Sequence, residues 1–477
     1  MRYCFMTTLI SVNNDFCQLQ TNNNALVDYL VSNLRFRQKG YQFTPLYKSR
    51  KWDGFVNFFS IKTGKFLTGI LPEVCLIIKK FGENYEFNDS RTPIKFKFDK
   101  IDEHFLQYYN DDMDTKIELT DYQTDLVNQA IKHKRGIIVA PTASGKTFLM
   151  SALLKALGEH EPTLILQNRK SLAAQNYDEI SRWGFKKIGS CWGGSNNPNT
   201  ITVATAQSIH HLENKLDDIR VLIVDEVHDM VSETAKDIYK KLKNAVVRIG
   251  LSATPFKHGE SDKVHKYMVK GFFGPVIKTN TTSTGRVTTA DLQQKGRLSQ
   301  SKCIFYKIKE PDIQLSIYTE AIDLGIVNNV HLHKKVVELT NTLTGRTLIL
   351  VDRIAHGDQL KKLIPTAYWI TGKDDNDSRK EVITMLQNSK TSCIAIATQQ
   401  IFNTGINVKI HNLINAAGGQ ADHLIIQRMG RGLRTADDKK EVLYIDFMFE
   451  NNPYLRKHSA KRAKILEKEG HSLQFLD

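Results

Sequence analysis

The sequence predicts an α/β fold with two parallel sheets in tandem, preceded by a smaller α+β domain. Short apolar runs recur between amphipathic stretches, first from Gly136 to Leu251 and again from Thr347 to Ile445. Buried parallel strands read as continuous apolar runs, so each series predicts one sheet covered by helices. The first hundred residues have a different texture, with many aromatic side chains and breaks at Pro72 and Pro93. They predict a separate accessory domain.

The predicted strands follow the order of these runs along the chain. In the first sheet they are residues 136–139, 163–166, 201–204, 221–224 and 247–251; in the second they are residues 347–351, 367–370, 393–396, 413–414 and 442–445. The looser, polar stretch between the two series carries the connection, which we place near residue 305. The expected domains are therefore residues 1–100, 101–305 and 306–450, followed by a basic helix at 451–477.

Composition restricts the classes of function. The 477 residues allow for about three domains, and 41% hydrophobic and 25% charged residues exclude a disordered or fibrous chain. Lys and Arg exceed Asp and Glu by 66 − 51 = 15, which favours a polyanionic partner over an inert basic surface. Six scattered cysteines give no zinc or disulfide framework. With no signal peptide or membrane span, we expect a cytoplasmic protein without a membrane partner.

A phosphate-binding loop follows the first strand of the first sheet. Residues 136–139 lead into a small-residue loop that ends in Lys146 and Thr147, and residues 148–157 read as a helix. Backbone N–H groups of such a loop cradle phosphates, its lysine reaches the β and γ oxygens, and its Thr hydroxyl binds Mg²⁺. The predicted cofactors are therefore ATP and Mg²⁺. The predicted ATP-binding residues are Ala140, where the usual pattern has Gly, and Pro141, Thr142, Ala143, Ser144, Gly145, Lys146 and Thr147.

An acidic pair follows the predicted strand 221–224. Asp225 and Glu226 come at its carboxyl end, where ligands bind in open α/β sheets. Asp225 can hold Mg²⁺ through water, and Glu226 can orient and deprotonate the water that attacks the γ-phosphate. Together with Lys146 they form the predicted catalytic centre.

At this point the chain resembles superfamily 2 helicases, because further motifs match in order from about Leu119 to Phe447. Residues 120–123 look like the adenine-reading segment, residues 252–254 like motif III, and residues 427–434 like motif VI. The resemblance implies two RecA-like motor domains. It assigns nucleotide contacts to Gln123 and Gly405, catalysis to Gln427 and to the arginine fingers Arg431 and Arg434, and coupling to His228, Ser252 and Thr254.

The same resemblance implies a nucleic-acid path along four segments, residues 167–175, 205–208, 351–353 and 398–407. Hydroxyl, amide and guanidinium groups suit contacts with phosphate and sugar, which position a strand without reading its bases. The residues assigned to this path are Arg169, Thr205, Gln207, Arg353 and Thr398. For Thr205, Gln207 and Thr398, capping of a buried strand end is the alternative.

The N-terminal region resembles that of UvsW-type phage helicases in residues 40–45, 51–54 and 69–73. Residues 35–65 are also basic and aromatic, with Asp53 as their one acidic residue, so they are suited to phosphates and unpaired bases. The residues assigned to DNA here are Lys48, Arg50, Lys51 and Trp52, and whether the Trp52 ring meets bases is left open. For Phe55 and Phe59 we expect core packing.

The resemblance implies an ATP-dependent 3′-to-5′ DNA helicase or translocase that remodels branched DNA. Its partners would be forked, branched and duplex DNA, with RNA–DNA hybrids as a further substrate, and we expect a monomer. The alternatives are an RNA helicase, a motor subunit of a restriction system, or a scaffold that does not hydrolyse ATP. For the basic C-terminal helix, packing on the second motor domain and contact with DNA are equally compatible with the sequence.

Overall fold

A computed structural model describes most of the chain. The described residues are 8–109, 117–141, 144–256, 262–314, 317–374, 381–382, 384–386, 389, 391–399, 410–419 and 441–477. The chain divides into two compact units, of which the first holds residues 1–140 and 145–286 and the second holds residues 287–477 with the short loop segment 141–144. In the described part, no helix is long and apolar enough to cross a membrane.

The described part of the first unit contains an eight-stranded sheet in the order β10-β9-β11-β8-β12-β13-β7-β14. All neighbouring strands of this sheet pair in parallel except β10, the edge strand, which pairs antiparallel with β9. The strands are β7 (Arg135–Val139), β8 (Thr163–Gln167), β9 (Ile188–Trp192), β10 (Ser195–Asn197), β11 (Ile201–Thr205), β12 (Val221–Asp225), β13 (Val247–Ser252) and β14 (Val276–Ile277). All five predicted strands are present, because their apolar runs are buried on both faces of the sheet.

Helices connect these parallel strands, as crossovers between parallel neighbours require. They are α4 (Asp121–His133), α5 (Lys146–Leu157), α6 (Lys170–Ser181), η4 (Ala206–Asp218), η5 (Val227–Asp229), α7 (Glu233–Lys241) and α8 (Lys263–Phe273), with η3 (Phe105–Tyr109) before them. Side-chain caps define several starts: the Ser232 hydroxyl accepts from the Ala235 N–H at the start of α7, and Asp262 accepts from the His265 N–H at the start of α8.

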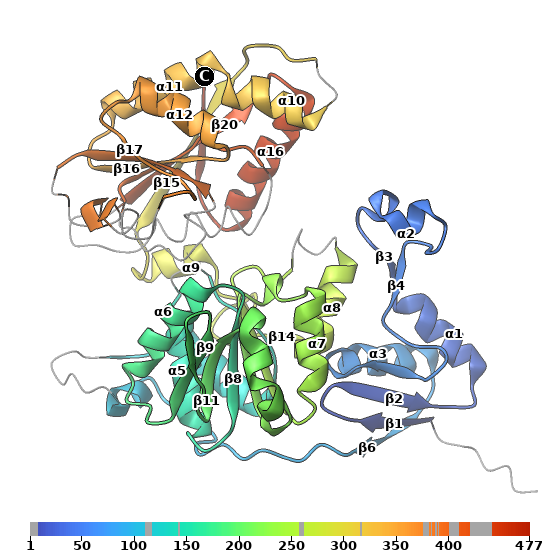
Figure 1. Cartoon of the computed structure of the whole chain (residues 1–477). Coiled ribbons are helices and arrows are strands. Elements are labelled where there is room, and N and C mark those ends of the chain that lie inside the picture. The colour runs from blue at the N-terminus through green and yellow to red at the C-terminus, as the bar shows by residue number, and fades with distance from the viewer. Residues whose placement is uncertain are drawn as a thin grey trace, which may run out of the picture. The chain divides into compact units, whose positions relative to one another are not determined.

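The N-terminal residues 8–89, here called the small domain, build a second sheet in the order β5-β2-β1-β6. Its elements are β1 (Thr8–Val12), β2 (Phe16–Gln20), α1 (Asn24–Asn33), β5 (Lys65–Leu67), η2 (Thr68–Ile70), α3 (Leu71–Phe81) and β6 (Tyr85–Asp89). Alternate residues of β1 and β2 are buried against α1 and α3 around Ile10, Leu26 and Ile78. Figure 1 shows both helices on one side of this sheet.

An arm, residues Arg35–Asn57, extends from the small domain. It comprises β3 (Arg35–Arg37), η1 (Tyr41–Phe43), α2 (Pro45–Lys48) and β4 (Phe55–Asn57), and β3 pairs only with β4 among the described strands. Figure 1 shows β3 and β4 leading away from the small sheet to α2. Phe59 is buried, as predicted, but Phe55 is not: its ring lies half-exposed beneath the Arg35 and Arg37 guanidiniums, 4.3 and 4.7 Å from its centroid. The short arm has no second layer that could cover this ring.

The small domain packs against α8 and β7 of the same unit. Lys270 on α8 forms a 2.6 Å ion pair with Glu73 on α3, and both side chains are mostly buried. The guanidinium of Arg135 donates to the carbonyls of Asn14 and Phe272, and the Tyr267 ring lies 4.6 Å from that of Phe36. The small domain and the first large sheet therefore form one packed unit.

The described part of the second unit contains a seven-stranded sheet in the order β17-β18-β16-β19-β20-β15-β21, all paired in parallel. Its strands are β15 (Gln300–Ile308), β16 (Arg346–Val351), β17 (Tyr368–Ile370), β18 (Cys393–Thr398), β19 (Asn412–Asn415), β20 (Glu441–Phe449) and β21 (Leu473–Leu476). Its helical segments are α9 (Thr289–Gln294), α10 (Tyr318–Ile322), η7 (Asp323–Val327), α11 (Val330–Thr342), α12 (Ile354–Leu363) and α16 (Pro453–Lys468). The predicted α/β class with parallel sheets is confirmed.

The structure bears on two expectations for this unit, where it begins and where its C-terminal helix packs. The division between the units lies at residue 286 rather than near 305, because β15 belongs to the second sheet through its pairing with β20. The C-terminal helix α16 packs on that sheet. Its Arg462, one of the basic residues of this helix, is buried and forms a bidentate ion pair with Asp446 on β20.

Candidate functional site

The carboxyl ends of the parallel strands in the first unit bring the predicted catalytic residues together. Strand β7 leads to the loop before Lys146, β12 ends at Asp225, and β13 ends at Ser252. Because β7, β13 and β12 are neighbours in one parallel sheet, their carboxyl ends lie at the same edge. The Ala140 N–H donates to the Ser252 carbonyl at 3.1 Å, which ties the start of the loop to the end of β13.

Lys146, at the first turn of α5, contacts both members of the acidic pair. Its ammonium Nζ lies 2.5 Å from Oε1 of Glu226 and 3.8 Å from Oδ1 of Asp225. The three side chains are largely buried, so solvent screens these charges weakly. The predicted centre of one lysine and two carboxylates therefore exists as a contiguous cluster.

Asp225 is held by two amide side chains. Gln167 at the end of β8 and Asn176 on α6 each donate from the side-chain nitrogen to Oδ2 of Asp225 at 3.3 Å. Burial raises the pKa of Asp225, the Lys146 charge opposes this rise, and the neighbouring Glu226 adds to it. The amides fix the orientation of one carboxylate oxygen, while the other faces Lys146.

Glu226 has an unusual backbone conformation, with φ at 49° in the left-handed region. A non-glycine residue there costs about 1–3 kcal/mol and is found most often at functional sites. Burial by itself raises the pKa of Glu226, but the charges of Lys146 and His228 outweigh it, so the pKa lies well below its usual range. Glu226 is therefore an ionised carboxylate held by the Lys146 ammonium and in contact with His228.

The residues assigned to coupling surround the other oxygen of Glu226. The Ser252 hydroxyl donates to Oε2 of Glu226 at 3.3 Å, and the buried His228 places Nδ1 2.8 Å from that hydroxyl and 3.3 Å from the same carboxylate oxygen. The Thr254 N–H donates to the Ser252 hydroxyl at 3.1 Å. His228 and Ser252 thus contact each other and Glu226 directly, and Thr254 joins them through Ser252.

Gln123 lies next to the loop glycine. Its side-chain oxygen accepts from the Thr120 N–H at 2.9 Å, and the Thr120 hydroxyl accepts from the Gln123 N–H, which forms a capping box at the start of α4. A Cβ on Gly145, at φ 79°, would come within 2.5 Å of Nε2 of Gln123. Gly145 is therefore favoured by its backbone conformation, and a side chain there would also displace the amide end of Gln123.

The residues assigned to the nucleic-acid path also follow strand ends. In the first unit, Arg169 and Gln207 are exposed after β8 and β11, whereas Thr205 is 4% exposed and donates to the Ser208 hydroxyl at 3.1 Å. In the second unit, Arg353 follows β16 and pairs with Asp323, and Thr398 is buried at the end of β18. For Thr205 and Thr398 this burial favours the capping alternative over DNA contact.

On the arm, the predicted DNA-binding residues gather at one place. Lys48, Arg50 and Lys51 are exposed, and together with Trp52 they line a shallow hollow of about 580 Å³. The half-buried Trp52 donates its indole N–H to the Phe55 carbonyl at 2.8 Å, so its nitrogen serves the arm itself. The exposed side chains of Phe43 and Leu46 lie on the same arm.

Several predicted site residues lie outside the described part of the chain. Thr142 and Ala143 fall between the two described ends of the phosphate loop, Pro141 and Ser144. Gly405 and the motif VI residues Gln427, Arg431 and Arg434 are also outside it. Thr147 is described and half-buried, one residue beyond Lys146 on α5.

Two residues of the cluster were missed by sequence reasoning. Gln167 had a weak signal, since it is the polar end of an apolar strand and begins a segment assigned to nucleic acid. Asn176 lies in mid-helix on α6, where a single polar residue has no distinguishing pattern. Only the fold brings both to Asp225.

The sequence comparisons confirm the resemblance to superfamily 2 DNA helicases. Residues 116–257 match the family model described as type III restriction enzyme, res subunit. The ATP-dependent DNA helicase uvsW of Enterobacteria phage T4 is 24% identical over 440 residues, covering 85% of this chain and 83% of that protein. The DNA 3′-5′ translocase XPB2 of Sulfurisphaera tokodaii is 27% identical over 374 residues, covering 70% and 82%.

A solved structure supports the fold. The fragment of a putative HsdR subunit of a type I restriction enzyme from Vibrio vulnificus matches with a TM-score of 0.57 at 19% identity, covering 75% of this chain and 67% of that one. At this identity the match concerns the architecture alone. It agrees with the presence of two parallel-sheet units in this chain.

Proposed function

We propose that this chain is an ATP-dependent DNA helicase or translocase that moves 3′ to 5′ and remodels branched DNA. The observation that carries the proposal is the cluster of Lys146, Asp225 and Glu226 at the carboxyl edge of the first large sheet. The uvsW relative is named an ATP-dependent DNA helicase, and XPB2 is named a DNA 3′-5′ translocase, which supports the proposed use of ATP, the DNA substrate and the polarity. The restriction-system alternative keeps a likeness in the family model over residues 116–257 and in the HsdR fragment, whereas neither sequence relative is named for RNA.

In the proposed mechanism the loop before α5 binds the phosphates of ATP. The backbone N–H groups of the first turn of α5, from Gly145 onward, are available to an anion at the helix N-terminus, where the helix dipole favours negative charge. Lys146 turns from Glu226 to the β and γ oxygens. The donor set fits Mg²⁺, since a Thr147 hydroxyl and an Asp225 carboxylate are hard oxygen ligands, and the ion would neutralise charge on the transferred phosphate.

Glu226 is the proposed general base. Its contact with Lys146 makes its basicity depend on whether that lysine is engaged elsewhere. While the ammonium is 2.5 Å away, the pKa of Glu226 is low and the carboxylate is a poor base. When phosphate draws Lys146 away, a cation leaves the buried carboxylate and its pKa rises. Proton abstraction from water is then favoured only when nucleotide is bound.

Arg431 and Arg434 are the proposed arginine fingers, with Gln427 beside them in sequence. Rapid hydrolysis usually requires positive charge beside the γ-phosphate. In the cluster of Lys146, Asp225 and Glu226, the lysine is the one cationic side chain. An arginine from the second motor domain would make hydrolysis depend on domain closure. His228 and Ser252, which contact Glu226, and Thr254, which contacts Ser252, are the proposed link from this step to DNA.

Arg169, Gln207 and Arg353 are the residues we retain for the strand path, because each is at least partly exposed beyond a strand end. Contacts of this type bind phosphate and sugar, so movement would be independent of sequence. The motor sheets offer nothing that distinguishes a junction from a plain duplex. We assign that preference to the arm, with Lys48, Arg50, Lys51 and Trp52.

The test measures ATP hydrolysis with forks, Holliday junctions, RNA–DNA hybrids, plain DNA duplex, RNA duplex and single strands. We expect branched DNA to stimulate most and RNA duplex least; the reverse order would contradict the proposal. Because the small domain packs on α8, its deletion would uncover apolar surface, so surface variants are the better probe.

A triple variant K48A/R50A/K51A should weaken binding to forks and lower the salt slope of log K by about 3. The matched control is K79A/K80A/K132A, which removes three exposed lysines elsewhere in the same unit. Equal losses in the two variants would mean that only net charge matters, and the assignment of the arm would be wrong.

A further inference from the structure

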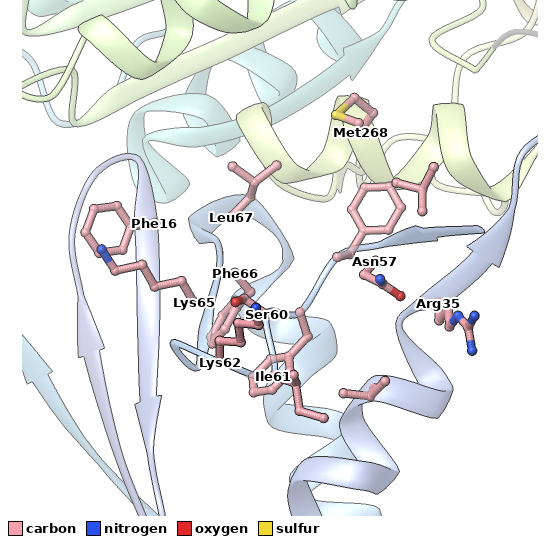
Figure 2. Close-up of a pocket in the computed structure, with 14 residues that line it drawn as sticks. Phe16, Arg35, Asn57, Ser60, Ile61, Lys62, Lys65, Phe66, Leu67 and Met268 are labelled. Atoms are coloured by element: carbon pink, nitrogen blue, oxygen red, sulfur yellow. The ribbon is translucent and has the colours of Figure 1, made fainter. Parts of the chain in front are cut away.

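A cavity of about 620 Å³ opens where the arm leaves the small domain. Its walls come from α1, β2, β3, β4, β5, the segment 58–62 and α8, with Met268 as the residue from α8. Figure 2 shows Leu67 below Met268, and the Lys65 amine beside the Phe16 ring. None of the residues assigned above to ATP or DNA lines this cavity.

The lining has a distinctive chemistry. Of its fourteen described residues, nine are aliphatic, aromatic or Met, two are the neutral polar Asn57 and Ser60, three are the cations Arg35, Lys62 and Lys65, and none is a carboxylate. Several walls, including Val31, Val56 and Met268, are only partly buried, so apolar surface faces the opening. The cavity thus combines an apolar interior with a positively charged margin.

We propose that this cavity receives an unpaired base of a DNA strand, with the adjacent phosphates at Arg35, Lys62 and Lys65. A flat base has apolar faces that pack against rings and aliphatic side chains, and its polar edge can meet Asn57. A volume of this size is in the range of sites that hold small ligands. The inference rests on the proposed function, since it requires the chain to bind DNA.

Charge favours a nucleic acid over an apolar peptide as the occupant. Lys62 and Lys65 are exposed, and Lys65 lies 4.1 Å from the Phe16 ring centroid. Arg35 pairs with Asp53, but both side chains are about half-exposed, and an ion pair of this kind is readily exchanged for phosphate. From the tip of the arm to Lys65, Asp53 is the one acidic residue in the sequence.

Position also favours a DNA strand. The cationic tip residues Lys48, Arg50 and Lys51 and the cavity are joined by β3 and β4, which carry Arg35 and Arg37. A strand that follows phosphate contacts from the tip to the base of the arm reaches the opening. An unpaired base is available there only on branched or single-stranded DNA, so occupancy would report the presence of a junction.

The test is a double-mutant cycle between the cavity and the base. V56W fills the cavity with an indole, and a fork whose unpaired arm carries abasic sites keeps the phosphates but lacks the bases. We expect the abasic fork to bind the unmodified protein about tenfold more weakly than the normal fork. V56W should bind both forks equally, at the weaker value, while its affinity for plain duplex stays unchanged.

The matched control is L76W, which places the same indole on the exposed face of α3, outside the cavity. L76W should keep the tenfold difference between the two forks. If V56W does not fold, as judged by its melting curve, V31W fills the cavity from α1 instead.

A tenfold difference that persists in the folded cavity variants would overturn the base-binding cavity and leave the helicase proposal intact. If the unmodified protein binds no DNA, the proposed function itself fails. A protein that binds both forks equally would show that this chain recognises phosphates alone.

Discussion

Nε2 of His265 lies 3.0 Å from the backbone carbonyl oxygen of His228. His265 is in the first turn of α8, and His228 follows the acidic pair and contacts Glu226. Further along α8, Lys270 pairs with Glu73 of the small domain and Met268 lines the cavity. One helix therefore contacts both the proposed branch-recognition domain and the loop that bears the proposed catalytic base.

We expect H265A to lower kcat for ATP about fivefold and leave KM for ATP little changed. The variant removes one buried contact to the loop that positions Glu226, and a hydrogen bond of this kind contributes about 1 kcal/mol. Steady-state ATPase assays with and without forked DNA measure the effect. H104A removes an exposed histidine and serves as the control. An unchanged kcat in H265A would show that the contact does not position the loop.

K146A and E226Q should each abolish ATP turnover for different reasons. K146A loses the ammonium that would bind phosphate, whereas E226Q loses the base and keeps the lysine. Equilibrium titration with ATP separates them: we expect E226Q to bind nucleotide at least as tightly as the unmodified protein, and K146A to bind about 100-fold more weakly. DNA-stimulated hydrolysis in either variant would exclude the proposed motor.

R431A and R434A should lower kcat about a thousandfold with little change in nucleotide affinity. The reason is that a finger stabilises charge in the transition state, not in the bound ground state. Calorimetric titration with a non-hydrolysable analogue measures affinity. A parallel loss of binding would assign these arginines to the folding of the second unit instead.

The second unit should lose stability as the pH falls from 6.5 toward 4. Burial lowers the pKa of His471 from 6.5 to about 4, and its Nδ1 lies 2.7 Å from the Ser301 hydroxyl. The unfolded chain binds the proton first, so this stabilisation is complete above pH 6.5 and is lost as the pH approaches 4. We expect His471 to contribute about 3 kcal/mol to the loss in the free energy of unfolding by pH 4, in addition to the contribution of His356, whose pKa burial also lowers.

Urea unfolding at pH 7 and pH 4 measures this loss. H471Q should be less sensitive to pH than the unmodified protein by that amount, and H331Q, which changes an exposed histidine, should not differ from it. Equal pH sensitivity of H471Q and the unmodified protein would refute the assignment to His471.

The sequence predicted the strands that are apolar throughout and missed the mixed ones. Residues 221–224 gave a clear signal, whereas β9 and β15 contain Ser, Gly, Gln and Lys, and they are defined by their sheet partners. For this reason the expected boundary near 305 falls inside β15, whereas the two compact units divide at residue 286. An expected cytoplasmic location stays a prediction.

The candidate site was predictable where chemistry coincides with a strand end. Asp225 and Ser252 end strands, so parallel topology brings them to one edge. His265 and Asn176 lie on helices, and a single polar residue there carries no periodic signal. The orientation of Trp52 was equally beyond the sequence, because its hydrogen bond to Phe55 depends on the turn that joins α2 to β4.

The second sheet has a consequence for how the protein is made. Strand β15 enters it beside β20 and β21, partners that follow about 140 and 170 residues later in the chain. Loop closure over such a distance is slow, and β15 leaves the ribosome long before its partners exist. The first unit can fold during synthesis, whereas the backbone groups of β15 stay unpaired until β20 and β21 have been synthesised. The yield of folded protein in a cell should therefore depend on how well the unpaired β15 is protected from aggregation during synthesis.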